Sequence, residues 1–262
     1  MVRDFIFDGR TLSSFGYMLV FENTEDTIET STVELKTIKG ARNDRSYVVG
    51  YEYADNYNGV YHVIKDPCQF PDSPYITDDE ISEFTRWLCR KQYKWFSFID
   101  EEDTADQIWY KAYFQVKKEY YGGCIGFELT ITTSAPYGFS RVIEHNFQTN
   151  QFKIDANTDE EGYIYPDITI KMLDSGTLRL TNTNENRVTE LKNCVANEII
   201  TLSGYDIQQI NTTNPNHKLI TEFNYKFPRL VCEYNNQVNV FNISPTCKIN
   251  LKYREIRKVG LK

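Results

Sequence analysis

Apolar and polar residues alternate along much of this chain, and the alternation predicts β-strands. Between residues 127 and 132 the apolar Phe127, Leu129 and Ile131 are separated by polar residues, and 33–38 shows a similar rhythm. A period of two places successive side chains on opposite faces of a strand. Shorter stretches of this kind predict further strands at 5–7, 17–21, 47–53, 60–64, 95–99 and 109–116. The first half of the chain is therefore predicted to be mainly β.

One segment of the first half interrupts this pattern and predicts a helix. Residues 77–80, Thr-Asp-Asp-Glu, have the form of a capping box, in which the threonine and the glutamate cap each other's backbone N–H groups. Ile81, Phe84 and Leu88 then recur at helical spacing. We expect a single helix over about 78–91.

The second half contains only strand signals. Short β segments are separated by turn residues at roughly 8–12-residue spacing or somewhat more, which is typical of a β-sandwich. The expected strands are 163–172, entered through Pro166, and 178–181, 198–202, 207–210, 230–234, 238–243 and 248–253. The second half is therefore predicted to be a β-sandwich without a helix.

The segment Ala135-Pro136-Tyr137-Gly138 ends the strand around 127–132 and separates these two halves. The only predicted helix lies before it, and the helix-free β set lies after it. We therefore expect a domain at 1–138, β-rich with one helix, and a second domain at 139–262. Whether the last strand, 249–257, returns to the first domain is left open.

Charge and cysteine usage narrow the class of protein. The formal net charge is −8, which argues against a protein that binds nucleic-acid phosphates. Residues 86–94 interleave basic and aromatic side chains, but a helix end with buried rings is the simpler interpretation. No apolar run reaches the length of a membrane span. The six cysteines are scattered, which favours reduced, mostly buried thiols.

No motif in the sequence indicates catalysis, a cofactor or a metal. The nucleophile, zinc-protease and phosphate-loop signatures are missing. His62, His145 and His217 lie far apart in the sequence, and the acidic runs at 100–103 and 159–161 lack the spaced ligands of a calcium loop. We therefore expect no catalytic, cofactor-binding or metal-binding residues, and the sequence assigns no glycan-binding residue.

Several segments, taken in order along the chain, resemble the distal tail protein family of bacteriophages and prophages with long, non-contractile tails. The similar segments are 5–9 with 13–17 near the start, the capped helix with Trp87-Leu88, the strand 126–131 with its closing 135–140, then 165–170, 227–230 and the final 249–255. Residues 234–237, Tyr-Asn-Asn-Gln, depart from the family's usual Gly-x-Asn turn. The resemblance covers nearly the whole chain and depends on the order of its landmarks.

The resemblance implies a structural virion protein that is not an enzyme. Its N-terminal domain would form a homo-hexameric ring, single or stacked in pairs, that joins the tail tube to the baseplate or tail fibre. Its C-terminal domain would be a galectin-like β-sandwich that holds receptor-binding proteins. The implied partners are other copies of the chain, the tail tube protein, a tail fibre or tail-associated hub protein, and receptor-binding or other baseplate proteins. The implied location is the virion tail tip after synthesis in the bacterial cytoplasm, with no specific nucleic-acid binding and no membrane insertion.

Two other classes of function remain open from the residues. A carbohydrate-binding module would need an exposed aromatic platform beside polar groups, because aromatic faces stack on sugar rings. The tyrosines available in the second half are Tyr163, Tyr165, Tyr205, Tyr225 and Tyr234, and ordinary packing explains each equally well. An enzyme on a sandwich scaffold, such as a cell-wall hydrolase, would need two convergent carboxylates in a cleft.

Overall fold

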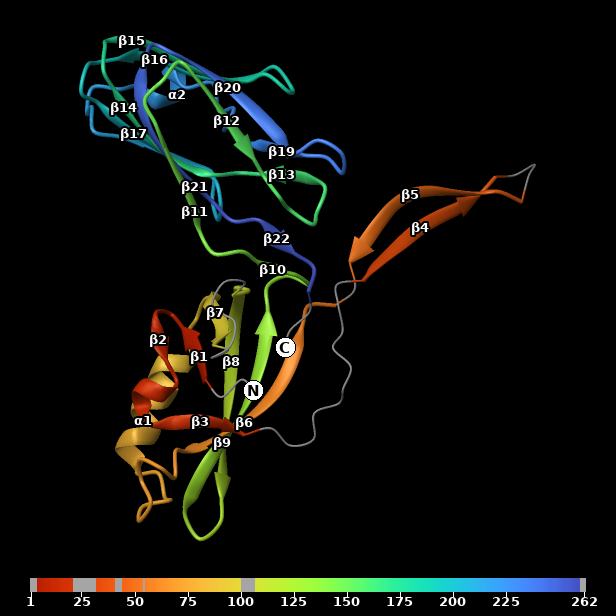
Figure 1. Ribbon diagram of the computed structural model, residues 1–262, viewed down its shortest axis with the longest axis vertical. Coiled ribbons are helices and arrows are strands. Elements are labelled where there is room, and N and C mark those ends of the chain that lie inside the picture. Colours follow the sequence, from red (N-terminus) through yellow and green to blue (C-terminus); the bar gives the residue numbers. More distant parts are fainter. Residues whose placement is uncertain (1–3, 21–31, 41–43, 54, 100–106, 260–262) are drawn as a thin grey trace. The chain divides into compact units, whose positions relative to one another are not determined.

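The computed structural model describes residues 4–20, 32–40, 44–53, 55–99 and 107–259. The chain divides into two compact units, one of 1–139 with 257–262 and the other of 140–256. Strands dominate both units (Figure 1), so the prediction of a mainly β protein is confirmed. Within the described residues, no helix is both long and apolar enough to cross a bilayer.

The first unit is built on a seven-stranded antiparallel sheet with the order β2-β1-β7-β8-β9-β6-β3. Its strands are β1 (Asp4–Phe7), β2 (Arg10–Thr11), β3 (Tyr17–Val20), β6 (Asn58–Lys65), β7 (Lys94–Ile99), β8 (Tyr110–Tyr120) and β9 (Cys124–Thr133). A short 3-10 turn, η1 (Ser13–Phe15), connects β2 to β3. The alternation in β9 places Phe127, Leu129 and Ile131 in the core of this unit, all almost fully buried.

The helix α1 (Asp78–Leu88) covers the core of the first unit. Its capping box forms as predicted, because the Thr77 hydroxyl accepts from the Glu80 N–H and the Glu80 carboxylate accepts from the Thr77 N–H at 2.7 Å. The Phe84 ring lies 4.4 Å from the Phe127 ring, and the Trp87 indole N–H donates to the Phe7 carbonyl at 2.9 Å. The helix ends at Leu88, earlier than the predicted 91, because Cys89 leaves the helical region with a ψ of 75°.

A separate two-stranded antiparallel sheet, β4 (Val33–Lys39) and β5 (Ser46–Tyr53), completes the strands described before the helix. Both strands were predicted from their sequence. The pairing runs from Val33 opposite Tyr53 to Lys39 opposite Ser46, with an irregularity after Lys36. We call β4 and β5 with their pairing the hairpin.

The second unit is a β-sandwich. One sheet has the order β11-β21-β14-β17-β18 and the other the order β12-β20-β15-β16, and both are antiparallel. The strands are β11 (Ile143–Phe147), β12 (Gln151–Asp155), β14 (Asp167–Met172), β15 (Gly176–Asn182), β16 (Arg187–Cys194), β17 (Ile199–Ser203), β18 (Gln209–Thr212), β20 (Val238–Ser244) and β21 (Cys247–Tyr253). Apolar side chains of both sheets form one continuous core, with Ile168 and Leu251 from the first and Leu180 and Phe241 from the second.

Two features of the second unit differ from the prediction. The strand expected over 163–172 is two strands, β13 (Gly162–Ile164) and β14, which belong to different sheets; β13 pairs with β19 (Leu230–Cys232). Pro166 lies between them and has no N–H to donate to a ladder. The expectation of a helix-free second half is also wrong, since α2 (Leu219–Glu222) makes a single turn. One turn is too short to show a helical period.

The chain passes between the two units twice, after Phe139 and after Ile256. The strand before the first crossing, β10 (Gly138–Phe139), pairs with β22 (Ile256–Arg257) at the second. Just inside the second unit, the Ser140 N–H donates to the Glu255 carbonyl at 2.8 Å and the Glu255 N–H donates to the Ser140 hydroxyl at 3.0 Å. The last residues, 257–262, group with the first unit, whereas β21 belongs to the second.

Candidate interaction surfaces

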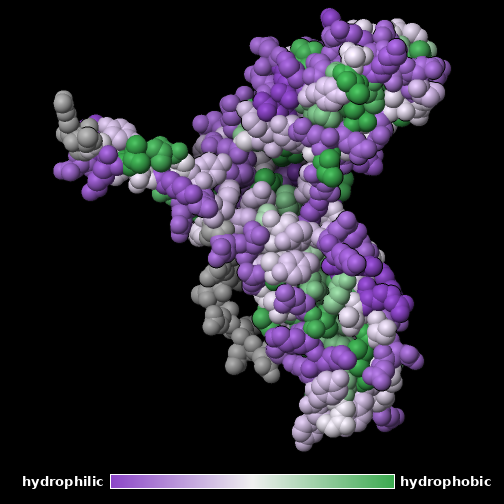
Figure 2. All heavy atoms as spheres, turned by 180° about the vertical axis from the view of Figure 1, so that it is seen from behind, coloured by the Kyte–Doolittle hydropathy of each residue, from purple (hydrophilic) through white to green (hydrophobic). Residues whose placement is uncertain are grey.

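The hairpin exposes apolar side chains to an unusual degree. Seven of its large hydrophobic residues are between 40% and 61% exposed: Val33, Leu35, Ile38, Tyr47, Val48, Val49 and Tyr51. Figure 2 shows hydrophobic colour along this segment. In the sheet of the first unit, by contrast, Phe127, Leu129 and Ile131 of β9 are almost fully buried.

The register of the hairpin gathers much of this apolar surface on one face. Because opposed residues of an antiparallel pair share a face, one face carries Val33, Leu35, Thr37, Val48, Tyr51 and Tyr53. The other face carries Glu34, Lys36, Ile38, Tyr47, Gly50 and Glu52, with an ion pair between Lys36 and Glu52. A two-stranded hairpin alone is only marginally stable in water. An apolar face of this kind is typical of a protein–protein contact.

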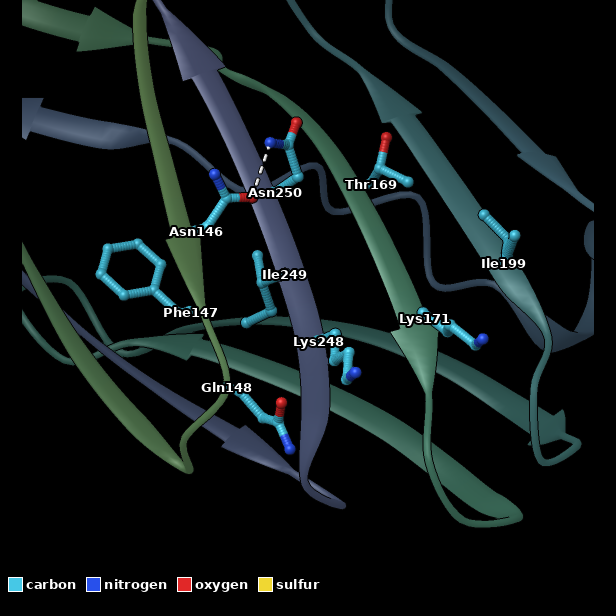
Figure 3. Close-up of a pocket in the computed structure, with 9 residues that line it drawn as sticks. All are labelled: Asn146, Phe147, Gln148, Thr169, Lys171, Ile199, Lys248, Ile249 and Asn250. Carbon is cyan, nitrogen blue, oxygen red and sulfur yellow. Dashed lines mark hydrogen bonds between the residues drawn. The ribbon is translucent and has the colours of Figure 1, made fainter.

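The second unit has a pocket of about 340 Å³ on the outward side of its five-stranded sheet. Its lining residues come from β11, β14, β17 and β21, with Gln148 just after β11 (Figure 3): Asn146, Phe147, Gln148, Thr169, Lys171, Ile199, Lys248, Ile249 and Asn250. The Asn250 amide donates to the Asn146 side-chain oxygen at 2.9 Å, which orders the polar floor between β21 and β11.

Lys171 and Lys248 lie directly opposite each other in the β14–β21 ladder, and both are exposed. Like charges at opposed positions destabilise a sheet unless an anion lies near them. This face is therefore suited to a carboxylate or another anionic group.

A buried polar cluster lies at another place in the second unit. It joins Cys194 at the end of β16, Glu198 just before β17, and His217 between β18 and α2. Their sulfur, oxygen and nitrogen ligand atoms all lie within 4.8 Å of one another. No short spacing motif marks this cluster in the sequence, because 22 residues (positions 195 to 216) separate Cys194 from His217.

Two family models together match most of the chain. Residues 1–135 match the family model described as the phage tail protein N-terminal domain, and residues 137–253 match the one described as the phage tail C-terminal domain. The chain belongs to this family of phage tail proteins. The resemblance of the segments from 5–9 to 249–255 is thereby confirmed.

A protein of solved structure has a similar fold. The Dit protein of phage SPP1, described as a paradigm of the hub adsorption apparatus in phages that infect Gram-positive bacteria, matches with a TM-score of 0.63. The match covers 97% of this chain and 99% of that chain, with 11% sequence identity, a level at which the likeness speaks of fold alone. No curated protein sequence matches this member of the family.

The aromatic residues considered above for nucleic-acid or sugar binding are packed within the fold or lie away from the pocket. Trp87, in the basic and aromatic stretch 86–94, is 2% exposed and is part of the core. The ring of Tyr163 lies under the Arg229 guanidinium at 3.5 Å, and the Tyr165 hydroxyl accepts from Arg229. Tyr225 and Tyr234 are more than half exposed but contribute nothing to the pocket, whose one aromatic, Phe147, stacks on Phe152 at 4.4 Å. The pocket therefore has no exposed aromatic ring on which a sugar could stack.

The histidines, acidic residues and cysteines considered as possible ligands do not gather into the sites that the sequence analysis weighed. His62 pairs with Glu119 in the first unit, and His145 stacks between Phe147 and Tyr253 in the second, so the three histidines form no common site. The acidic run at 100–103 lies outside the described residues. In the run at 159–161, Glu161 accepts from the Tyr234 N–H at 2.9 Å. All six cysteines are free thiols, and burial raises the pKa of Cys194, Cys232 and Cys247 to about 11.

Proposed function

We propose that this chain forms a homo-hexameric ring at the distal end of a long, non-contractile phage tail. The ring, single or stacked in pairs, links the tail tube protein to the baseplate or to a tail fibre or tail-associated hub protein. The second unit is the galectin-like part that holds receptor-binding or other baseplate proteins. In this role the protein is a structural part of the virion tail tip, made in the host cytoplasm, with no enzymatic activity, no specific nucleic-acid binding and no membrane insertion.

The observation that carries this proposal is the exposure of Leu35, Val48 and Tyr51 on one face of the hairpin, in a member of a phage tail protein family. A ring built from head-to-tail contacts covers the same surface on every copy, because each subunit meets its neighbour in the same way. Such a contact would bury Leu35, Val48 and Tyr51 without needing a second kind of protein. Both β4 and β5 are edge strands of their two-stranded sheet, and an edge strand can extend a neighbour's sheet.

The second unit supports docking to protein partners more than binding to sugars. Its pocket presents lysines, amides and a hydroxyl, and these groups suit the carboxylates and backbone groups of a protein surface. The carbohydrate-binding alternative lacks a specific observation in its favour, and so does a hydrolase.

The proposal is tested by Leu35→Glu. Leu35 is 61% exposed, so the substitution leaves the chain folded but places a charge in the proposed subunit contact. We expect the wild-type chain to form hexamers by light scattering and rings by negative-stain imaging, and the variant to stay monomeric with an unchanged circular dichroism spectrum.

Ile220→Glu is the matched control, because Ile220 is an aliphatic residue of the second unit with 85% exposure. It should leave ring formation intact. A wild-type chain that stays monomeric at every concentration, alone and with purified tail tube protein, would contradict the proposal.

A further inference from the structure

The cluster of Cys194, Glu198 and His217 brings three different metal-ligating groups into the interior of the second unit. Cys194 is 2% exposed, and the side chains of Glu198 and His217 are 0% and 1% exposed. A buried carboxylate and a buried imidazole are costly unless something compensates them. Glu198 and His217 therefore need partners that compensate for their burial.

His217 is oriented by Glu222. Its Nδ1 lies 2.6 Å from Glu222 Oε2, which fixes the ring and leaves Nε2 on the opposite side. Glu222 itself accepts from the Asn193 amide at 2.8 Å and from the Lys218 N–H at 2.9 Å, and these bonds hold its carboxylate in place. The contact between Glu222 and Nδ1 resembles the carboxylate–histidine pairs that support metal sites.

The other ring nitrogen, Nε2, is buried and has no hydrogen-bond partner among the described residues. Glu198 Oε1 is 2.8 Å away, but the two atoms do not meet in hydrogen-bond geometry. A neutral imidazole whose proton is on Nδ1 directs a lone pair from Nε2 toward this carboxylate. Two electron-rich atoms this close need a cation between them.

Cys194 favours a metal ion over a proton as this cation. Its thiol donates to the Leu191 carbonyl at 3.3 Å, and its sulfur also lies within 4.8 Å of the ligand atoms of Glu198 and His217. A proton on Nε2 could serve Nε2 and Glu198 Oε1, whereas a metal ion serves these two and the Cys194 sulfur together. Nitrogen, oxygen and sulfur in one site are the donor set of zinc.

Glu198 is also held in place for this role. Its Oε2 accepts from the Val195 N–H at 2.9 Å, and its Oε1 accepts from the Thr212 hydroxyl. A tetrahedral zinc site separates ligand atoms by roughly 3.3 Å or more, given bonds of 2.0–2.3 Å. The nitrogen and oxygen, 2.8 Å apart here, would therefore move slightly apart on binding.

We propose that Cys194, Glu198 and His217 bind a divalent metal ion of the zinc class, with Glu222 as the positioning residue of His217. Three protein ligands leave one position for a water molecule. Binding displaces the thiol proton of Cys194, as metal binding does for any cysteine ligand. The ion fastens the connection between β18 and α2 to the ends of β16 and β17, a role that does not depend on ring formation.

The test is a titration of the metal-free full chain with Co²⁺, followed by its absorption spectrum. We expect one ion per chain, visible bands of a tetrahedral site and a near-ultraviolet charge-transfer band from sulfur. Cys194→Ser should lose the charge-transfer band, and His217→Gln should lose binding. Glu222→Gln should bind about 10- to 100-fold more weakly, the usual effect of losing a group that orients a ligand.

Cys232→Ser is the matched control, because Cys232 has the same 2% exposure in the same core but lies outside the cluster. It should keep the band. A second measurement needs no variant: in the full wild-type chain, Zn²⁺ should raise the melting temperature of the transition in which the second unit unfolds. A wild-type chain that neither binds Co²⁺ nor gains stability from Zn²⁺ overturns the proposal, and so does a charge-transfer band that persists in folded Cys194→Ser.

Discussion

The strand pairs β8–β9 and β4–β5 are both antiparallel ladders of alternating residues, and both lie in the first unit. In β9 the alternate apolar side chains are packed under α1 and against the other strands of the sheet. In β4 and β5 the corresponding side chains are mostly exposed. Alternation thus determines which side of a strand is apolar, but only the rest of the fold, or another chain, determines what covers it.

The largest difference in the free energy of unfolding should come from truncating one apolar residue in each strand pair. Phe127→Ala removes a fully buried ring that stacks on Phe84, and we expect a loss of about 3–5 kcal/mol in the free energy of unfolding. Leu35→Ala should change it by less than about 0.5 kcal/mol in the monomer. Urea denaturation followed by tryptophan fluorescence measures this, since Trp87, Trp95 and Trp109 all belong to the first unit. Similar losses for the two variants would show that the hairpin is covered within the monomer.

Replacing one glycine by alanine in each strand pair should give an intermediate difference in the free energy of unfolding. A Cβ on Gly126 in β9 would lie 2.6 Å from the Val63 carbonyl oxygen, so the backbone must shift. Gly126→Ala should therefore destabilise the first unit by about 1–3 kcal/mol. A Cβ on Gly50 in β5 would meet nothing within 4 Å, and Gly50→Ala should be close to neutral in the same denaturation experiment. A destabilised Gly50→Ala monomer would mean that β5 is closely packed there.

The smallest effects should come from the surface ion pairs, where the two ladders are alike. Lys117 lowers the pKa of Glu128 in β8–β9, and Lys36 lowers the pKa of Glu52 in β4–β5, in each case mainly through a side-chain hydrogen bond. A carboxylate with a lower pKa in the folded chain stabilises it above the pKa of the unfolded chain. This stabilisation is lost as the pH falls below about 5.

Lys117→Gln and Lys36→Gln should each weaken this acid dependence by a similar small amount, and salt should reduce the difference from wild type. The measurement is the denaturation midpoint between neutral and acidic pH. A markedly larger effect in one ladder would contradict the idea that both pairs are solvent-screened.

The sequence predicts local features of this fold well. The capping box at Thr77 specifies the start of α1, and the alternation in 127–131 specifies the inward face of β9. Features that depend on residues distant in the sequence cannot be predicted from local patterns. Pro166 separates β13 and β14 into different sheets, although 163–172 is continuous in pattern, and α2 is too short to show a period.

The same distinction between local and long-range features applies to the candidate sites. The strands of the hairpin were predictable, but their exposure depends on what the remaining chain leaves uncovered. Cys194 and His217 come together only because β16, β17 and β18 place the two connections at one end of the sandwich. Family resemblance carried the functional inference, since no single motif in the residues does so.

The double crossing between the units has a mechanical consequence. The second unit is an insertion whose entry and exit are held together by the bonds between Ser140 and Glu255. Tension on this unit would be shared between the two backbone connections. The same arrangement makes the unit an exchangeable cassette, because another domain with neighbouring ends could replace 140–256 and leave the first unit's seven-stranded sheet continuous.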